Sequence, residues 1–384
     1  MTSASVFKFS SVLAVLLLVA PNMALAAVTV QPVHDDEVIE ILPVITRTRP
    51  SALVAERKAP DAATTAIAVR ADISQARQTG DTRYWGRAQS ALAPWWDRAD
   101  APVDMAILQA TVQQGRHEFE ASRKVLTTAL TRSPNHAQGW LNLAALERLA
   151  GNYAQALAAC ARVASAGQAL YAQACQLETQ SLQGQHQAAT QGLQELANQA
   201  RDNGQRSWLW SLLAESQERW GRDAQAAQAF QKSLSFESDL YTAIAYSDLL
   251  LRTGALAQAL TVLFPLPETD AVLLRQATAW RRLGDARWNA ALVTLKERSA
   301  ELKRRGDDPM LHGRELALVA LWLEDDPASA LVVARSNLTL QREPIDWWVA
   351  LQSAKQAKDA TATAELTSAL RQSGLQDARL VIAQ

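Results

Sequence analysis

Seven glycines lie at nearly even intervals along this chain, at steps of 35, 36, 33, 37, 33 and 30 residues. A period near 34 residues is typical of a helix–turn–helix unit that stacks repeatedly into a solenoid. We therefore expect an all-α, right-handed superhelical solenoid of about eight repeats, degenerate at both ends. The glycines of this ladder are Gly80, Gly115, Gly151, Gly184, Gly221, Gly254 and Gly284.

The first 26 residues have the pattern of a signal peptide rather than of the fold. Lys8 precedes an apolar run at 11–20, Pro21 ends the run, and 24–26 reads Ala-Leu-Ala, which matches a cleavage site. The alternative is an uncleaved anchor, but the run is shorter than the ~20 residues that span a bilayer. We predict a signal peptide at 1–26, cleavage after Ala26, no membrane span afterwards, and a periplasmic mature protein.

Residues 27–62 differ from the rest of the chain. They contain Pro32, Pro43, Pro50 and Pro60, and prolines at this density prevent a long helix. We predict an extended arm at 27–62, followed by the solenoid at 63–384. The arm is either a flexible tether or a strap that docks on the solenoid through the apolar residues of 38–42.

The residues around the glycines repeat by type, which defines a register. A small side chain is expected seven residues before the glycine and again five residues after it, because the paired helices approach closely there. A larger apolar group four residues further on fills the gap to the next repeat. In register these residues are Ala144, Ala214, Ser247 and Ala277; then Ala156, Ala189, Ala226 and Ala259; then Cys160, Leu193, Phe230 and Leu263. The glycine itself is expected in the left-handed conformation that ends a helix.

These positions follow the pattern W-x2-L-G-x2-Y…A-x3-F…P. Residues 207–238 match it best, through Trp210, Leu213, Ala214, Gly221, Ala226 and Phe230. On these residues the chain resembles the tetratricopeptide repeat (TPR) family over nearly all of its length after the arm. The segments at 84–89 and 341–344 are similar to those of exported proteobacterial tetratricopeptide proteins of unassigned function.

The ends of the solenoid depart from the pattern. Acidic residues at 324–326 and the pair Lys358-Asp359 stand where glycine turns are expected. Terminal repeats cover an otherwise bare apolar face, so such degeneracy is expected. The adjacent tryptophans Trp95-Trp96 and Trp347-Trp348 are interpreted as caps of the solenoid ends, with an aromatic anchor for a partner as the alternative.

No residue pattern indicates catalysis, a cofactor or a metal. The five histidines lack metal-ligand spacing, and neither a nucleophile motif nor a phosphate-binding glycine loop occurs. With 38 Lys and Arg against 39 Asp and Glu, no excess charge favours nucleic acid. The chain is therefore predicted not to be an enzyme. The remote alternative is an enzyme that uses the segment 285–312, through Glu301, Asp307, Asp308 or His312.

The two cysteines, Cys160 and Cys175, lie on adjacent helices of the register. In an oxidising compartment such a pair can form a disulfide. The alternative is two buried thiols that act as small apolar side chains.

The resemblance implies binding through a concave groove lined by the first helix of each repeat. The register expects that wall to include Asn142, Arg148, Glu215, Asp248, Arg275, Arg281 and Arg282. The wall is acidic in the middle repeats and basic near the last three arginines. We predict a non-enzymatic scaffold of the cell envelope that binds a protein or peptide of unknown identity. The alternative is a permanent adaptor subunit of an envelope assembly or transport system.

Overall fold

The computed structural model describes residues 61–306 and 308–383. These residues belong to one compact unit that covers 58–384. The predicted signal peptide at 1–26 and nearly all of the arm at 27–62 lie outside the described residues, so both stay predictions. The first helix, α1, begins at Ala62, and the carboxylate of Asp61 caps it by accepting a 2.9 Å hydrogen bond from the backbone N–H of Thr64.

The described residues form helices in nine successive pairs, where the sequence predicts about eight repeats. The first helices of the pairs are α1 (Ala62–Thr79), α3 (Val103–Gly115), α5 (Ala137–Leu149), α7 (Ala169–Leu182), α9 (Asn203–Arg219), α11 (Leu240–Arg252), α13 (Asp270–Leu283), α15 (Gly313–Trp322) and α17 (Pro344–Gln356). The second helices are α2 (Arg83–Leu92), α4 (Phe119–Arg132), α6 (Tyr153–Ser165), α8 (His186–Gln199), α10 (Asp223–Phe236), α12 (Leu256–Leu263), α14 (Arg287–Arg304), α16 (Pro327–Asn337) and α18 (Ala360–Ser373). A 3-10 turn, η1 (Pro309–His312), precedes α15, and α19 (Ala378–Ala383) follows the last pair.

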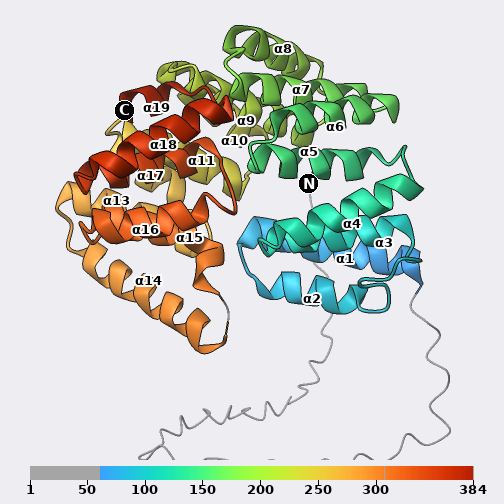
Figure 1. Cartoon of the computed structure of the whole chain (residues 1–384), viewed down its shortest axis with the longest axis horizontal. Coiled ribbons are helices and arrows are strands. Elements are labelled where there is room, and N and C mark those ends of the chain that lie inside the picture. Colours follow the sequence, from blue (N-terminus) through green and yellow to red (C-terminus); the bar gives the residue numbers. More distant parts are fainter. Residues whose placement is uncertain (1–60, 307, 384) are drawn as a thin grey trace, which may run out of the picture. The chain divides into compact units, whose positions relative to one another are not determined.

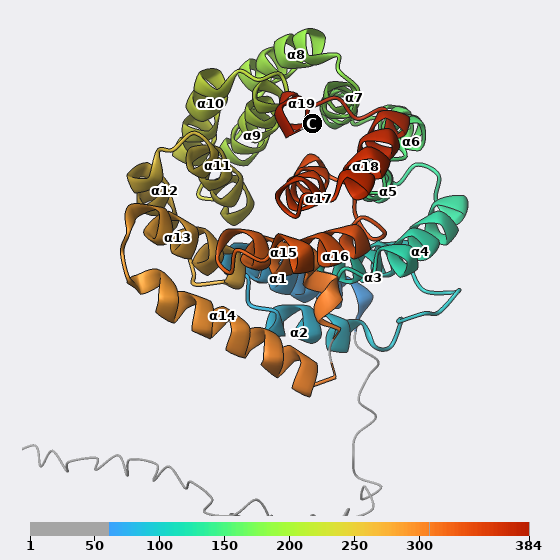
Figure 2. The same ribbon diagram turned by 60° about the vertical axis from the view of Figure 1, so that its left-hand side comes forward.

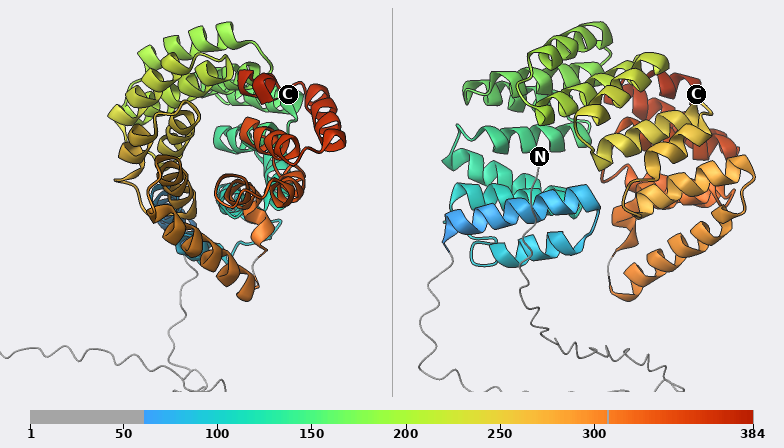
Figure 3. Two further views of the ribbon diagram at one scale, coloured as in Figure 1. Left: turned by 90° about the vertical axis from the view of Figure 1, so that its left-hand side faces the viewer. Right: turned by 180° about the vertical axis from the view of Figure 1, so that it is seen from behind.

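The pairs wind into a superhelix, which confirms the predicted all-α solenoid. In Figure 2 the second helices α10, α12 and α14 lie on the outside of the curve and the first helices α9, α11 and α13 lie on its inside. Figure 3 shows the same winding from two further sides. Figure 1 shows that the pairs from α15 onward lie beside α3–α9 rather than continuing away from them.

The register of small and large residues around the turns is confirmed in the core. All twelve residues placed by the sequence at the three positions are fully buried. They are Ala144, Ala156, Cys160, Ala189, Leu193, Ala214, Ala226, Phe230, Ser247, Ala259, Leu263 and Ala277, each 0% exposed. Alanine and serine at the crossings let the paired helices approach closely, while the larger side chains fill the space between neighbouring repeats.

Six of the seven ladder glycines adopt the left-handed conformation, with φ between 66° and 86°. The prediction is wrong for Gly115, which is the last residue of α3. His117 is the left-handed residue of that turn, with φ of 61°. Position 115 needs a glycine for a different reason. A Cβ there would lie 2.4 Å from the ring of Trp85, which is too close. The glycine stands two positions before the residue that needs positive φ, with Arg116 between them.

Non-glycine residues also form the two degenerate turns near the C-terminus. Asp325 and Lys358 have φ of 54° and 57°, at the places where the sequence lacks a glycine. A left-handed conformation costs about 1–2 kcal/mol for a residue with a Cβ. These two turns therefore keep the helix–turn–helix geometry at an energetic cost that glycine avoids.

The segments before α17 and α19 pack against the ends of earlier first helices. The backbone N–H of Arg342 donates to the carbonyl of Leu149, the last residue of α5, at 2.7 Å. The N–H of Gln376 donates in the same way to Leu182, the last residue of α7, at 2.8 Å. Carbonyls at a helix C-terminus lack partners within the helix, so these two bonds satisfy them and hold successive turns of the superhelix together.

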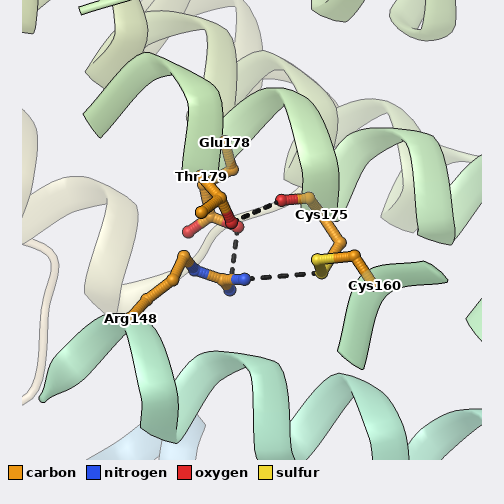
Figure 4. Close-up of a disulfide and its surroundings, with 5 residues drawn as sticks. All are labelled: Arg148, Cys160, Cys175, Glu178 and Thr179. Carbon is orange, nitrogen blue, oxygen red and sulfur yellow. Dashed lines mark hydrogen bonds and ion pairs between the residues drawn. A yellow bond between two sulfur atoms is a disulfide. The ribbon is translucent and has the colours of Figure 1, made fainter. Parts of the chain in front are cut away.

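Cys160 of α6 and Cys175 of α7 are joined in a disulfide that links two neighbouring repeats (Figure 4). Arg148 of α5 lies beside it, with its Nη1 atom 3.5 Å from the Cys175 Sγ atom. The same guanidinium forms an ion pair of 2.9 Å with Glu178. The disulfide therefore adds a covalent link to a contact that packing and an ion pair already make.

Candidate binding site

A cavity of about 180 Å³ lies on the inner side of the superhelix. Its walls come from the C-terminal ends of α9, α11 and α13 on one side and from α15, α17 and α19 on the other. The lining residues are Glu218, Asp248, Leu251, Arg252, Arg282, Trp322, Ile345, Trp348 and Arg379. We call this cavity the inner pocket. It exists because the last repeats turn back beside the middle ones.

Both carboxylates of the inner pocket are neutralised within the protein. Glu218 accepts from Arg252 at 3.1 Å and from Arg379 at 3.0 Å. Asp248 forms a two-bond pair with Arg275, at 2.7 and 2.8 Å. The acidic groups therefore have charged partners already and leave little negative potential for a cationic ligand.

Arg282 is the exception among the charged groups of the inner pocket. Arg282 is partly exposed and partly covered by the neighbouring protein, and among the residues that the structure describes no carboxylate lies within ion-pair distance of it. Its Nη1 atom donates to the carbonyl of Leu251 at 2.8 Å. Its guanidinium carbon lies 6.0 Å from the centre of the Trp322 ring, a distance at the limit of a cation–π contact. Burial lowers the pKa of Arg282, which means that the neighbouring protein removes water from the guanidinium without supplying a countercharge.

Two tryptophans form the apolar side of the inner pocket. The rings of Trp322 and Trp348 meet edge to face, with 6.1 Å between their centres. Ile345 of α17 extends this apolar side, and Leu251 contributes an apolar side chain from α11. Trp347, the neighbour of Trp348, is 4% exposed and packs into the core. Trp347 and Trp348 were predicted together to cap the solenoid end, but they have different roles. The Trp347 ring packs in the core, and the Trp348 ring lines the inner pocket.

The structure brings only some of the predicted groove residues together. Asp248 and Arg282 line the inner pocket, and Arg275 touches it through Asp248. Asn142, by contrast, is 8% exposed and donates to the Thr111 hydroxyl at 2.9 Å. Arg148 of α5 lies beside the disulfide and is not part of the inner-pocket lining. These two residues support contacts between repeats.

The predicted basic surface near Arg275, Arg281 and Arg282 is mostly neutralised, which corrects the sequence-based expectation. Arg275 is 3% exposed and its charge faces Asp248. Arg281 pairs with Asp325 and donates to the carbonyl of Trp322 at 2.6 Å. Of these three arginines, only Arg282 presents its guanidinium to the pocket without a carboxylate partner in the described part of the chain.

Glu215 of α9 occupies a different stretch of the inner wall. Its Oε2 atom lies 3.3 Å from Nη1 of Arg219. Burial raises the pKa of Glu215 to about 7, although the charge of Arg219 lowers it. A carboxyl with this pKa carries its proton part of the time at neutral pH, so the predicted acidity of the middle repeats is weaker than the residue count indicates.

Comparison with solved structures places a Rap protein complexed with Competence and Sporulation Factor among the similar folds. That structure aligns over 83% of this chain and 87% of its own length, with a TM-score of 0.53 and 8% identity. The tetratricopeptide register and this likeness agree. The chain has a tetratricopeptide-repeat fold.

Two other solved structures of helical proteins align less closely. A human IFIT1 dimer with PPP-AAAA covers 76% of this chain and 69% of its own, with a TM-score of 0.44 and 10% identity. The Cut9–Hcn1 structure of the APC/C covers 81% and 74%, with a TM-score of 0.41 and 12% identity. No protein-family model and no curated protein sequence matches the chain.

Arg252 lines the inner pocket but was not among the groove residues predicted from the sequence, whereas Arg282, at the same position of the register, was predicted. Arg252 and Arg282 each stand two residues before a ladder glycine, Gly254 and Gly284. In α11 and α13 the side chain at this position lines the inner pocket. Trp322, Ile345 and Arg379 carry no comparable signal, because they reach the pocket only through the return of the last repeats.

The described residues contain no group of three His, Cys, Asp or Glu side chains placed to hold a metal ion. In the segment 285–312, Glu301 forms ion pairs with Arg304 and Arg305. Asp308 caps η1 by accepting from the N–H of Met310. Asp307 lies outside the described residues. His312 packs against His117, with 5.3 Å between the ring centres, so each described member of this set has a structural role.

Proposed function

We propose that the chain is a non-enzymatic scaffold that binds a protein or peptide along the inner face of its superhelix. The observation that carries the proposal is the inner pocket, which joins two tryptophan rings to an arginine without a carboxylate partner among the described residues. Aromatic and arginine side chains supply much of the energy at protein interfaces. A preformed pocket also spares a ligand part of the entropic cost of ordering the site.

The rigidity of the surrounding repeats supports this proposal. Arg252 and Arg379 are both held by Glu218, and Asp248 is held by Arg275. The similar Rap structure was solved as a complex with Competence and Sporulation Factor, so a fold of this class can hold a separate molecule.

We propose the cell envelope as the site of action, through export directed by residues 1–26. The cleavage pattern at 24–26 supports this location, and the disulfide between Cys160 and Cys175 suits an oxidising compartment. Among the described helices, none is both long and apolar enough to cross a bilayer. Fractionation of cells that express the chain with and without residues 1–26 tests export. Cytoplasmic recovery of both forms would refute it.

Photo-crosslinking in the cell tests binding at the inner face. A benzoylphenylalanine at Tyr241, an aromatic residue of α11 that is 58% exposed and lies beside Glu215 of the inner wall, should yield a specific adduct. The matched control is Phe264 at the end of α12, an aromatic residue that is 84% exposed. Adducts only from Tyr241 support inner-face binding. Equal adducts from both positions, or none from either, would refute it.

The same experiment separates a recognition scaffold from a permanent adaptor. An adaptor gives one adduct that co-purifies in a fixed stoichiometric ratio with the chain. A scaffold for passing ligands gives substoichiometric and more varied adducts.

A further inference from the structure

The inner pocket has a definite chemical preference that follows from its charges and its apolar wall. We propose that it binds an acidic side chain, Asp or Glu, that lies next to a large apolar side chain in an extended segment of a protein partner. The carboxylate meets Arg282, and the apolar group packs on Trp322, Trp348 and Ile345. This inference rests on the proposed function, because it names the ligand of the same surface.

The charge pattern selects an anion. Glu218 and Asp248 are each paired with arginines inside the protein. Arg282, by contrast, donates one hydrogen bond, to the Leu251 carbonyl. A guanidinium has five N–H donors in a planar fork that fits a carboxylate. Arg282 therefore has donors left for a ligand, and in this partly dehydrated place a charge-assisted bond is stronger than in water.

The same residues disfavour a basic ligand. Arg252 and Arg379 are paired with Glu218, and Asp248 is paired with Arg275. A lysine or arginine side chain therefore meets the unpaired charge of Arg282 and no free carboxylate among the residues of the pocket lining that the structure describes. A neutral amide has the same shape as the acid but makes weaker hydrogen bonds to Arg282, because it carries no negative charge. The positive charge of Arg282 then stays without a counter-ion. The pocket consequently discriminates Glu from both Lys and Gln.

The size and lining of the pocket favour side chains over a cofactor. Its volume of about 180 Å³ lies below the roughly 300–1,000 Å³ of small-molecule sites. The indole rings and Ile345 form an apolar wall beside the guanidinium, and Leu251 adds an apolar side chain from α11. An acidic residue followed by a large apolar residue fits both the guanidinium and the apolar wall. Consecutive side chains of an extended peptide point in different directions, so each can meet a different part of the pocket.

Selection from a random 12-residue peptide library against the purified full chain tests the inference. We expect enriched peptides to contain Asp or Glu next to Leu, Ile, Met, Phe or Trp. The best peptide is then compared with its Glu→Gln (or Asp→Asn) form by calorimetry. We expect at least a tenfold weaker affinity for the amide form, a result that needs no protein variant.

The variant Arg282→Gln assigns the effect to the pocket. It should weaken the acidic peptide at least tenfold and the amide peptide by much less, so that the difference in affinity between the two peptides largely disappears, because the carboxylate and Arg282 act on each other. Trp348→Leu should weaken both peptides alike. The matched control is Arg335→Gln, which removes an exposed arginine of α16 that pairs with Glu365, and it should change neither affinity.

Each outcome decides a separate point. If no peptide is enriched, both the inference and peptide binding by the scaffold are refuted. If peptides bind without an acidic residue, or if Arg282→Gln leaves the difference between acid and amide intact, the inference fails while the proposed function stands.

Discussion

Arg379 of α19 forms an ion pair with Glu218 of α9, with 3.0 Å between its Nη1 atom and the Glu218 Oε2 atom. The two residues are far apart in the sequence, and their contact joins the last helix of the chain to a middle repeat. Asp377 holds the same guanidinium at 2.6 Å, and its carboxylate is fully buried. This pair closes one end of the inner pocket and locks the returning repeats to the earlier ones.

Replacing Arg379 with Gln should loosen that lock. The substitution leaves the buried carboxylate of Asp377 without its cation, a loss of about 3–5 kcal/mol for buried pairs. We expect faster amide hydrogen exchange in α17–α19 and unchanged exchange in α1–α4, since repeats contact mainly their neighbours. Arg335→Gln is the control, because an exposed pair contributes about 1 kcal/mol or less. Unchanged protection in α19 would contradict the assigned role.

The disulfide predicts both a chemical and an energetic result. Thiol titration of the denatured, unreduced protein should detect almost no free thiol. Replacing Cys160 and Cys175 together by Ala should lower the free energy of unfolding by about 3 kcal/mol, since the bond closes a loop of 15 residues. Denaturant unfolding measures this change. Two reactive thiols in the native chain would show that the pair is not bonded.

Gly115 and Gly86 should respond to alanine in opposite directions. A Cβ at Gly115 meets the Trp85 ring at 2.4 Å, so Gly115→Ala should lower the free energy of unfolding by about 1–3 kcal/mol. Gly86 is an exposed residue within α2, and nothing lies within 4 Å of its added Cβ. Gly86→Ala should therefore stabilise the protein by about 0.5–1 kcal/mol. Equal effects in denaturant unfolding would refute the packing explanation.

His117 should make stability depend on pH. Burial, aided by the neighbouring His312, lowers the pKa of His117 from 6.5 to about 4. Between these values the unfolded chain binds more protons than the folded one. The contribution of His117 is therefore complete above pH 6.5 and is lost as the pH falls toward 4. Between pH 7 and pH 5 this loss is about 2 kcal/mol.

The variant His117→Asn isolates this effect, because Asn tolerates the left-handed conformation and does not titrate. Glu215, whose pKa is raised to about 7, titrates in the same range with the opposite sign. It contributes equally to both proteins and cancels in their difference. Urea unfolding at both pH values should show a steeper loss for the wild type, and parallel losses would contradict the prediction.

The core of the solenoid could be predicted from the sequence because it depends on local spacing. Ala144, Ala156 and Cys160 stand at set distances from Gly151, and helix geometry alone brings them to the interface between paired helices. The prediction failed at Gly115 for an equally local reason. Its turn is longer, and only the position of the Trp85 ring reveals why a glycine is needed there.

The charges of the groove could not be predicted in the same way. Arg275 and Arg281 occupy first helices as expected, but each finds a carboxylate on another repeat, Asp248 and Asp325. Whether two such side chains meet depends on the rotation between repeats, and small rotations add up along a superhelix. The register names the residues on the wall without stating which of them remain free to bind.

The sequence by itself thus determined the repeat, its register and the buried positions, since these follow from contacts within about one repeat length. Only the tertiary structure decided that the last repeats return beside the middle ones, where Trp348 and Arg379 meet Arg252 and Arg282. That arrangement depends on the accumulated curvature of nine helix pairs and on hydrogen bonds such as that from Gln376 to Leu182. No local sequence pattern determines this accumulated curvature, and the inner pocket forms because of it.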